Sequence, residues 1–169
     1  ERKDVDMVLM ATPEFWHREQ VEAAAAAGKH ILCEKPMASS IAAADAMIAA
    51  CERSRVRLMI AHSRRFTRRY QEVRAALDRG EIGQVIVARE NERRSRPQPG
   101  QIGYWSPEHW TSDPAVSVGA VLSNGIHETD LLRWFAGAEP ASVFAEHSTT
   151  VAGNRVPDFI TITVKFTNG

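Results

Sequence analysis

Three short polar segments each follow an apolar stretch of the sequence, at the point where a strand would end. They are Thr12-Pro13, Glu34-Lys35-Pro36 and His62-Ser63-Arg64. In open α/β sheets, ligands bind outside the carboxyl ends of the parallel strands. If the apolar stretches are parallel strands, these polar segments gather at one edge of a sheet. That edge is the first candidate for a ligand site.

Lys35 is the member of this group best suited to proton chemistry. A lysine just past a buried strand can donate a hydrogen bond to a substrate hydroxyl and favour its ionisation. Pro36 fixes the direction of the chain behind it. The residues alone leave a second interpretation open, in which Lys35 is a solvated lysine in a turn, paired with Glu34.

His127 is the second candidate for proton transfer, because histidine is the usual proton donor or acceptor near neutral pH. It lies in a stretch with helical periodicity, and Asp130, three residues on, is close enough on the same face to orient its imidazole. The alternative is a helix-face histidine with a satisfied hydrogen bond. The zinc motif HExxH is not matched, since Leu131 stands where the second histidine belongs, and we predict no metal site.

A basic segment and a group of aromatic residues are the remaining candidates. Residues 63–70 combine four arginines with two aromatic residues, a composition that could bind phosphate or single-stranded nucleic acid. The chain holds 21 basic and 21 acidic residues and no second basic cluster in a recognisable nucleic-acid fold, so a solvated helix start is favoured and no nucleic-acid partner is expected. Tyr104, Trp105 and Trp110 could wall a pocket or pack down as an anchor for their loop.

The first part of the chain alternates strand and helix patterns with short connections. This alternation predicts βαβ crossovers, and hence a parallel sheet with helices on both faces. Ser39 or Ser40 is placed to cap the second helix. The expected strands are residues 5–10, 31–33 and 57–61, and the expected helices are residues 14–27 and about 42–52.

Beyond residue 62 the pattern changes. Residues 158–166 alternate between apolar and polar, as in an antiparallel sheet with one wet face. A loop as long as the one expected at residues 97–114 is unusual in a compact domain and is often functional. The other elements expected here are helices at 67–78 and 119–135 and strands at 84–91 and 141–146.

Cysteine usage and the chain ends bear on compartment and completeness. Cys33 and Cys51 stand in no metal-like spacing, which suits a reducing compartment, and no membrane span or leader is evident. We therefore expect a cytoplasmic protein with no membrane partner. The chain begins at Glu1 and ends in Asn168-Gly169, a hairpin signal after an alternating strand, so we expect an excerpt from a longer polypeptide.

Four motifs, in one order along nearly the whole chain, are similar to those of a single enzyme family. The chain resembles the middle of a Gfo/Idh/MocA-family oxidoreductase, the group typified by glucose-fructose oxidoreductase and inositol dehydrogenase. The resemblance implies an α/β fold, with the later part of a Rossmann-type doubly wound domain at residues 1–62 and the first part of an α+β domain with an open antiparallel sheet at 63–169. The motifs are VDMVLMATPEFWHREQVEAAAAAGKHILCEKPMA (5–38), LMIAHSRRF (58–66), GEIGQV (80–85) and GAVLSNGIHETDLLRWFAG (119–137).

The resemblance also implies roles for the candidate residues. Lys35 would orient or polarise the substrate hydroxyl beside a nicotinamide, and His127 would move the hydroxyl proton as hydride leaves the carbon. Glu34 and Pro36 would shape the turn on the cofactor side. The cofactor contacts implied in this way are Thr12, Pro13, Glu34, Lys35, Pro36, Arg64 and Arg65.

On the substrate side the sequence departs from the family pattern at two places. Many members carry an aspartate four residues before the histidine, where this chain has Ser123, although Asn124 fits a branch with Asn-x-Ile-His. Trp110 falls where the family often has a Trp-Arg pair, but Thr111 follows it. The implied substrate contacts are Lys35, Trp110, Ser123, Asn124 and His127.

The implied activity is reversible hydride transfer between a secondary alcohol of a sugar, cyclitol, polyol or dihydrodiol and NAD or NADP. The GxGxxG phosphate loop would precede this segment, so the segment alone is expected to be inactive. The implied assembly is a homodimer or homotetramer through the antiparallel sheet. Two alternatives remain: a catalytically silent binding or regulatory module on the same fold, and, less favoured, an enzyme that forms a Schiff base through Lys35.

Overall fold

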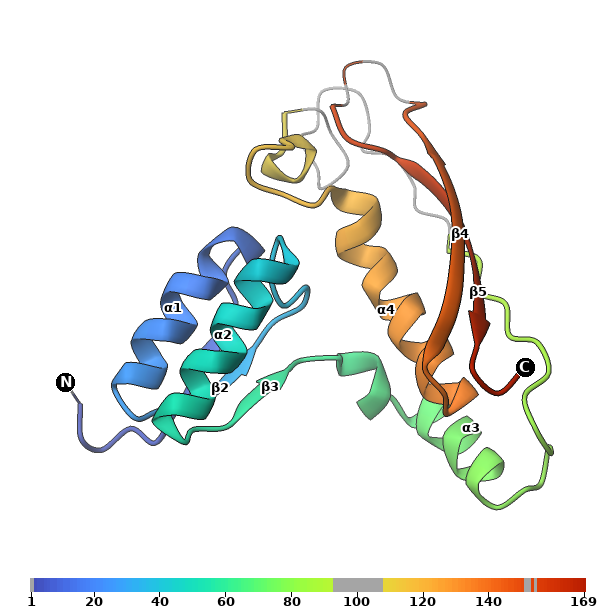
Figure 1. Cartoon of the computed structure of the whole chain (residues 1–169), viewed down its shortest axis with the longest axis horizontal. Helices are drawn as coiled ribbons and strands as arrows, with labels where there is room; N and C mark the ends of the chain where they lie inside the picture. The colour runs from blue at the N-terminus through green and yellow to red at the C-terminus, as the bar shows by residue number, and fades with distance from the viewer. Residues whose placement is uncertain (1, 93–107, 151–152, 154) are drawn as a thin grey trace. The chain divides into compact units, whose positions relative to one another are not determined.

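The computed structural model describes residues 2–92, 108–150, 153 and 155–169 (Figure 1). The chain forms two compact units, Glu1–Ala61 and His62–Gly169. We call them the first unit and the second unit and describe each by itself. The predicted aromatic residues Tyr104 and Trp105 lie outside the described residues.

The first unit contains a parallel sheet of three strands in the order β1-β2-β3. These strands are β1 (Met7–Met10), β2 (His30–Cys33) and β3 (Leu58–Ile60). Met10 pairs with Cys33, and Cys33 pairs with Ile60, so the three strands end at the same level. The predicted strands and their parallel pairing are confirmed.

Helices α1 (Glu14–Ala26) and α2 (Ile41–Ser54) connect these strands and pack against each other (Figure 1). The Ser40 side chain caps α2 by accepting a hydrogen bond from the Ala43 amide at 3.2 Å. The buried core lies between the helices and one face of the sheet. It contains Met10, Val21, Ala25, Ile31, Cys33, Met47, Ala50 and Cys51.

The expectation of helices on both faces of the sheet is wrong for the described residues. Two right-handed crossovers that step in the same direction place both helices on the same face. Successive residues of a strand point to opposite faces of the sheet, and only one face is covered by the helices. Met7, Leu9 and Met59 point to the other face and are exposed. The apolar sequence of these strands correctly indicated strands, but it did not show which helices cover them.

The second unit is built around α4 (Ala120–Ala136) and an antiparallel pair of strands, β4 (Pro140–Ser148) and β5 (Phe159–Phe166). Its other elements are α3 (Arg68–Asp78) and the short 3-10 helices η1 (Ser63–Phe66) and η2 (Trp110–Ser112). Gly137 ends α4 in the left-handed conformation at φ 61°, as the sequence suggested. The predicted antiparallel pairing of residues 158–166 is confirmed.

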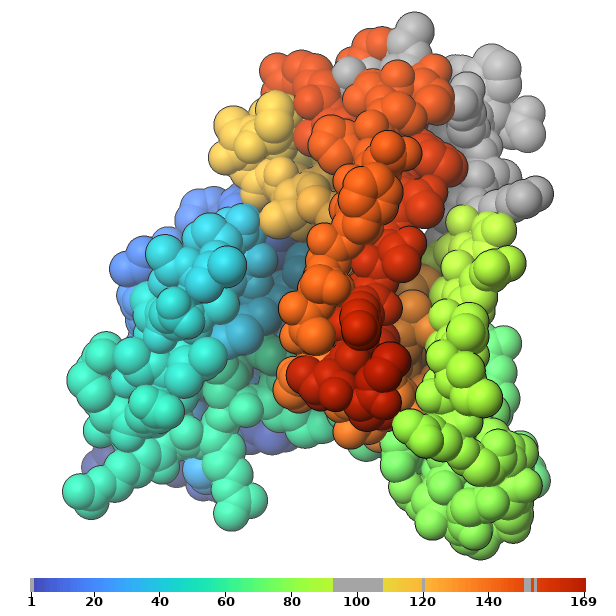
Figure 2. All heavy atoms as spheres, turned by 45° about the vertical axis from the view of Figure 1, so that its right-hand side comes forward, coloured from blue at the N-terminus to red at the C-terminus, as the bar shows by residue number. Residues whose placement is uncertain are grey.

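Residues 84–91 do not form the predicted strand. A strand needs a hydrogen-bonded neighbour, and the sheet of the second unit contains only β4 and β5 among the described residues. Ile86 and Val87 are 89% and 79% exposed, so their apolar alternation has no partner surface here. Figure 2 shows this yellow-green segment at the molecular surface, together with the atoms of β4 and β5 in orange and red.

Aromatic side chains join α3 to α4 within the second unit. The Tyr70 and Phe135 rings lie 6.2 Å apart between centroids, and Trp134 stacks on Phe135 at 5.5 Å. Leu131 is buried on α4 one turn earlier. None of the described helices combines the length and the apolarity that crossing a membrane requires.

Candidate active site

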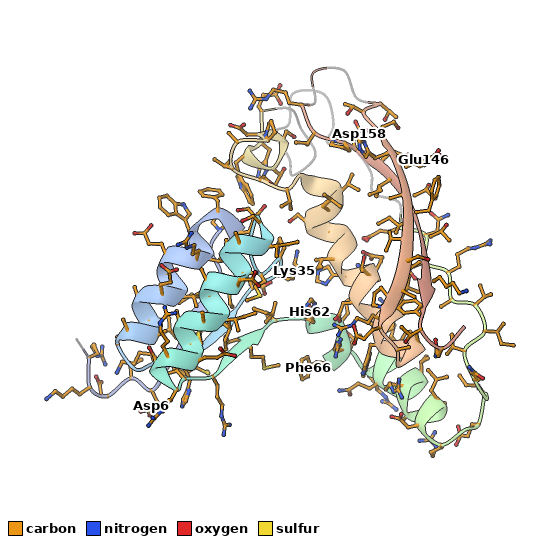
Figure 3. All side chains as sticks on the ribbon, in the orientation of Figure 1. Asp6, Lys35, His62, Phe66, Glu146 and Asp158 are labelled. Atoms are coloured by element: carbon orange, nitrogen blue, oxygen red, sulfur yellow. The ribbon has the colours of Figure 1, made fainter. Side chains whose placement is uncertain are left out.

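The carboxyl edge of the parallel sheet brings together the predicted site residues of the first unit. The turn after β2 is joined to β1, because the Glu34 amide donates to the Met10 carbonyl at 2.9 Å. The Lys35 amide donates to Glu34 Oε2 at 3.1 Å, and the Lys35–Pro36 peptide bond is cis. Lys35 is half-buried just beyond the end of β2 (Figure 3). The expected convergence of the first two polar segments is therefore present.

His17 links these two segments, and sequence reasoning did not single it out as a site residue. Its Nε2 lies 2.9 Å from the Thr12 carbonyl oxygen, and its Nδ1 lies 3.1 Å and 3.2 Å from the carbonyl oxygens of Pro36 and Met37. The side chain is completely buried. The helical spacing of Glu14, His17 and Val21 was the available signal, since it places His17 on the buried face of α1.

Thr12 and Cys33 have different environments at the same edge. The exposed Thr12 hydroxyl hydrogen-bonds Gln20 Oε1 at 2.7 Å, which ties the first turn to α1. Burial, and secondarily the nearby Glu34 charge, raises the pKa of the Cys33 thiol to about 11. Because the thiolate is the reactive form, Cys33 is a core residue and not a nucleophile near neutral pH.

In the second unit, both arginines of η1 bind carboxylates of α4. Arg65 donates two hydrogen bonds to Asp130, at 2.8 Å and 2.7 Å, and Arg64 pairs with Glu128 and, at 3.3 Å, with Glu92. Bidentate pairs of this kind are among the stronger polar interactions in proteins. Arg64 and Arg65, two of the four arginines of the basic segment, are therefore paired with acidic residues within the second unit.

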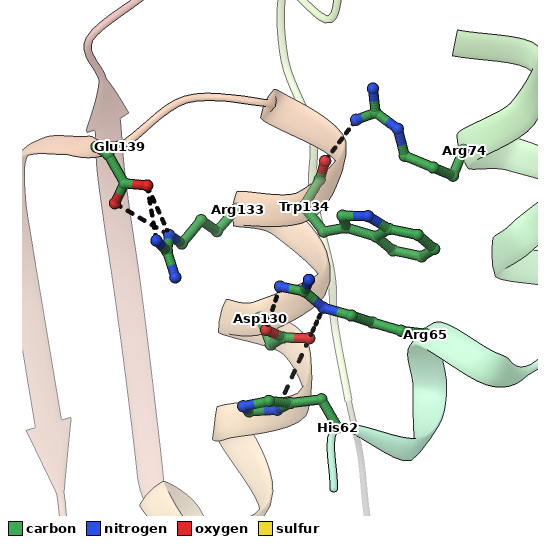
Figure 4. A network of polar contacts seen from close by, with 7 residues as sticks. All are labelled: His62, Arg65, Arg74, Asp130, Arg133, Trp134 and Glu139. Atoms are coloured by element: carbon green, nitrogen blue, oxygen red, sulfur yellow. Dashed lines mark hydrogen bonds and ion pairs between the residues drawn. The ribbon is translucent and has the colours of Figure 1, made fainter. Parts of the chain in front are cut away.

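The Asp130 carboxylate is bound by residues distant in the sequence. Figure 4 shows its carboxylate between Arg65 and His62, whose Nδ1 lies 3.7 Å from Oδ2. Both oxygens of Asp130 accept from Arg65, and the orientation of His127 by this carboxylate stays a prediction. The spacing of three residues places Asp130 and His127 near one another on α4. The residue that binds the Asp130 carboxylate is Arg65, which is distant in the sequence.

The same network extends along α4. The Arg65 guanidinium lies over the Trp134 ring, 5.5 Å from its centroid, and Arg74 of α3 donates to the Trp134 carbonyl at 2.6 Å (Figure 4). The latter bond satisfies a carbonyl in the last turn of α4. Together these contacts fix η1 and α3 against the helix that carries His127.

Glu128, the neighbour of His127 in sequence, has a strongly perturbed carboxyl group. The Glu128 side chain is 13% exposed. Its buried Oε2 accepts no hydrogen bond from the described residues. Burial, followed by a hydrogen bond with Glu92, raises the pKa of Glu128 to about 7 in spite of the Arg64 charge. A proton held between Glu128 and Glu92 would supply a hydrogen-bond donor, and the raised pKa of Glu128 favours the protonated pair below about pH 7.

The raised pKa of Glu128 predicts that the free energy of unfolding decreases as pH rises. The folded state binds this proton more tightly than the unfolded state, so the stabilisation is complete below about pH 4.5 and is lost as pH rises to about 7. The loss is up to about 3 kcal/mol. We expect Glu128→Gln to remove this decline in urea unfolding curves recorded at a series of pH values.

Glu81→Gln is the matched control for that experiment. A hydrogen bond from Arg79 lowers the pKa of the exposed Glu81, so its contribution has the opposite sign. Glu81→Gln should therefore leave the decline between about pH 4.5 and 7 in place. If Glu128→Gln also leaves the decline unchanged, the carboxyl pair does not hold the proton.

The predicted substrate-side residues lie on α4 and η2. His127 and Asn124 are half-buried, and Ser123, one turn before His127, is buried. Helical spacing places Ser123, Asn124 and His127 on neighbouring positions of one face. Trp110 is half-buried in η2, with its ring 5.5 Å from that of His109.

The candidate residues thus form two groups, one in each unit. The first contains Thr12, Pro13 and the Lys35 turn, and the second contains the arginines of η1 and the His127 face of α4. The approach of Lys35 to His127 remains a prediction. In the described part of the chain, no three histidine, cysteine or acidic side chains are grouped in a way that could hold a metal ion.

Two family models match the chain. Residues 1–62 match an oxidoreductase family with an NAD-binding Rossmann fold. Residues 70–169 match the GFO/IDH/MocA C-terminal domain. The chain therefore belongs to the Gfo/Idh/MocA family of oxidoreductases, and its Rossmann-type α/β fold is that of the family.

Two curated relatives share 34% identity with the chain. One is the 1,5-anhydro-D-fructose reductase of Ensifer adhaerens, aligned over 98% of this chain and 48% of the relative. The other is the myo-inositol 2-dehydrogenase of Thermotoga maritima, aligned over 89% of this chain and 42% of the relative. The chain spans about half the length of the curated relatives that it matches.

Solved structures give the same result. The aldose-aldose oxidoreductase from Caulobacter crescentus, complexed with glycerol, superposes with a TM-score of 0.81 at 32% identity, covering 99% of this chain and 49% of that one. A levoglucosan dehydrogenase in complex with NADH and levoglucosan superposes with a TM-score of 0.80 at 27% identity, covering 100% and 46%. Both neighbours are named as enzymes that act on sugars or their derivatives.

Proposed function

We propose that the complete protein transfers hydride between a nicotinamide cofactor, NAD or NADP, and a secondary alcohol of a sugar, cyclitol, polyol or dihydrodiol. The observation that carries this proposal is the placement of Lys35 at the carboxyl edge of the parallel strands, in a chain that belongs to this oxidoreductase family. The relatives' names, which include a sugar reductase and an inositol dehydrogenase, support the substrate class.

The residues of the sheet edge fit a nicotinamide cofactor. The edge follows the carboxyl ends of adjacent parallel strands, which is where dinucleotides bind in this fold. We assign cofactor contacts to Thr12, Pro13 and the Glu34-Lys35-Pro36 turn. Arg64 and Arg65 are proposed to contribute through N–H donors beyond those in their ion pairs with α4.

The proposed chemistry divides between two side chains of this chain. When bound, the nicotinamide takes up the hydride that leaves the substrate carbon. Lys35 Nζ donates a hydrogen bond to the reacting hydroxyl oxygen and stabilises its developing negative charge. The His127 imidazole accepts the hydroxyl proton as the carbonyl double bond forms, and it returns that proton in the reverse reaction.

Substrate recognition is proposed for Trp110, Ser123 and Asn124. Serine and asparagine side chains can both donate and accept hydrogen bonds, which suits the hydroxyl groups of a polyol. The Trp110 ring offers an apolar face to the carbon skeleton of a sugar. Ser123 stands where many family members have an aspartate. A hydroxyl therefore replaces a carboxylate at this position, one turn before His127.

Assembly and location extend the same proposal. We propose a homodimer or homotetramer through the β4–β5 sheet, which is supported by the exposed apolar side chains Phe144 and Phe159 on one face of that sheet. A cytoplasmic location is supported by the two buried cysteines, Cys33 and Cys51, which are both free.

A substrate panel tests the proposed activity. The complete protein is mixed with NAD or NADP and a series of sugars, inositols and dihydrodiols, and the absorbance of the reduced nicotinamide is followed. Turnover of at least one of these alcohols is expected. If the cofactor binds in a separate titration but no alcohol is oxidised, the catalytically silent binding module becomes the better account, and Ser123 in place of the family aspartate becomes its explanation.

A further inference from the structure

His17 is a buried side chain to which the proposed chemistry gives no part. Its imidazole lies between the turn after β1 and the turn after β2, with contacts of 2.9 Å to Thr12 and 3.1 Å to Pro36. Each turn carries residues assigned above to the cofactor or the substrate. His17 is therefore the side chain that joins the two halves of the sheet edge.

All three partners of His17 are backbone carbonyl oxygens, which only accept hydrogen bonds. A ring N–H therefore donates to Thr12 from Nε2 or to Pro36 and Met37 from Nδ1, according to the tautomer, and an apolar side chain in its place leaves buried carbonyl groups without this donor. The His17 side chain has no exposed surface in the folded chain. The contacts of His17 are thus specific to the turns and are more than general packing of the core.

The backbone of the Lys35 turn is held on both sides of Lys35. On the upstream side, the backbone is held by the Glu34 amide, which donates to the Met10 carbonyl. On the downstream side, His17 holds the carbonyls of Pro36 and Met37. Lys35 lies between these two anchors, so the direction of its side chain depends on both. A displacement of about 1 Å in a catalytic group can cost about 10²-fold in rate.

We propose that His17 is a positioning residue for Lys35 and for the cofactor-side turns. It acts through the backbone of Pro36, Met37 and Thr12 and does not itself touch the reacting atoms. This inference rests on the proposed function for its effect on turnover, whereas its effect on the order of the turn is independent of any activity.

The test compares three variants of the complete protein. His17→Leu removes the ring donors at similar volume, and His17→Gln restores an N–H donor. Val21→Ala is the matched control, since Val21 is buried on the same face of α1 one turn later and touches the core without bonding either turn. Hydrogen–deuterium exchange of residues 34–38, measured without cofactor, is the first readout, and kcat, KM and the cofactor dissociation constant are the others.

The expected result separates positioning from stability. Well below the melting temperature of all the variants, His17→Leu should speed exchange in residues 34–38 by about 10-fold and lower kcat by about 10- to 100-fold, with a smaller change in KM. His17→Gln should recover part of both losses, and Val21→Ala should show neither. The proposal is overturned if His17→Leu and Val21→Ala behave alike in exchange. If the wild type has no turnover, the exchange data still decide the positioning role, and only the proposed function fails.

Discussion

Replacing Lys35 with methionine should lower kcat of the complete enzyme by about 10²- to 10⁴-fold, because the variant keeps the length of the side chain and loses its charged donor. The interaction is made with charge that develops on the hydroxyl oxygen, so kcat and kcat/KM should fall together. Initial rates at varied substrate concentration and saturating cofactor measure both quantities. A loss confined to KM would instead make Lys35 a residue of ground-state binding.

Lys29→Met is the matched control for this variant. Lys29 and Lys35 flank the same strand, β2, at its opposite ends, and Lys29 donates to the Arg2 carbonyl at 3.0 Å, away from the carboxyl edge. This control should retain wild-type kcat. Equal losses in the two variants would mean that the charge of the unit, and not the placement of Lys35, affects the rate.

His127→Ala should cause a loss of the same order as Lys35→Met, and the double variant should lose little more than either single variant. Groups that act on one proton transfer as a unit give strongly non-additive effects. His147→Ala, on the exposed strand β4, is the control for removal of an imidazole. If the fold-loss in kcat of the double variant equals the product of the two single losses, Lys35 and His127 act independently. That result would contradict a shared proton-transfer step.

The fold was predictable where local pattern and tertiary structure agree. Apolar runs ended by polar turns gave the three parallel strands, and the Ser40 cap and Gly137 marked helix boundaries that the structure has. The strand expected at residues 84–91 failed because alternation describes a surface that could pair and does not provide the neighbouring strand.

The candidate site was predictable by residue type and not by contact. Lys35 and His127 were identified because few residue types move protons at the end of a strand or on a helix face. The Arg65–Asp130 pair and the Glu128–Glu92 pair were missed because the partners are distant in sequence. Spacing within one helix predicts which side chains are neighbours on that helix, but contacts between elements decide which of them carries a hydrogen bond.

Removal of the Asp130 carboxylate should give the largest loss of stability in the second unit. Its side chain is 8% exposed and holds Arg65 in a bidentate pair, with His62 also within 3.7 Å. Removing one partner of a buried pair leaves the other charge without compensation, so Asp130→Ala should lower the free energy of unfolding by about 3 kcal/mol. Arg65 is partly exposed, which keeps the expected loss at the lower end of the range for buried pairs. Urea unfolding followed by circular dichroism measures the change.

The pair formed by Arg133 and Glu139 provides an internal control, because it involves the same helix but lies in solvent. The two side chains are 51% and 67% exposed and are joined at 2.6 Å. Water screens such a pair, so Glu139→Ala should leave the free energy of unfolding nearly unchanged. Similar losses for Asp130→Ala and Glu139→Ala would show that burial does not distinguish the two pairs.

A double-mutant cycle distinguishes the ion pair from the loss of packing around Asp130. If the pair is responsible, Arg65→Met should cost little in a protein that already carries Asp130→Ala, and the coupling energy should be about 1–3 kcal/mol. Additive losses would instead place the effect of Asp130 in its packing or in its contact with His62. Because Arg65 also lies over Trp134, this result decides whether η1 is held to the helix of His127 mainly by charge or mainly by the aromatic ring.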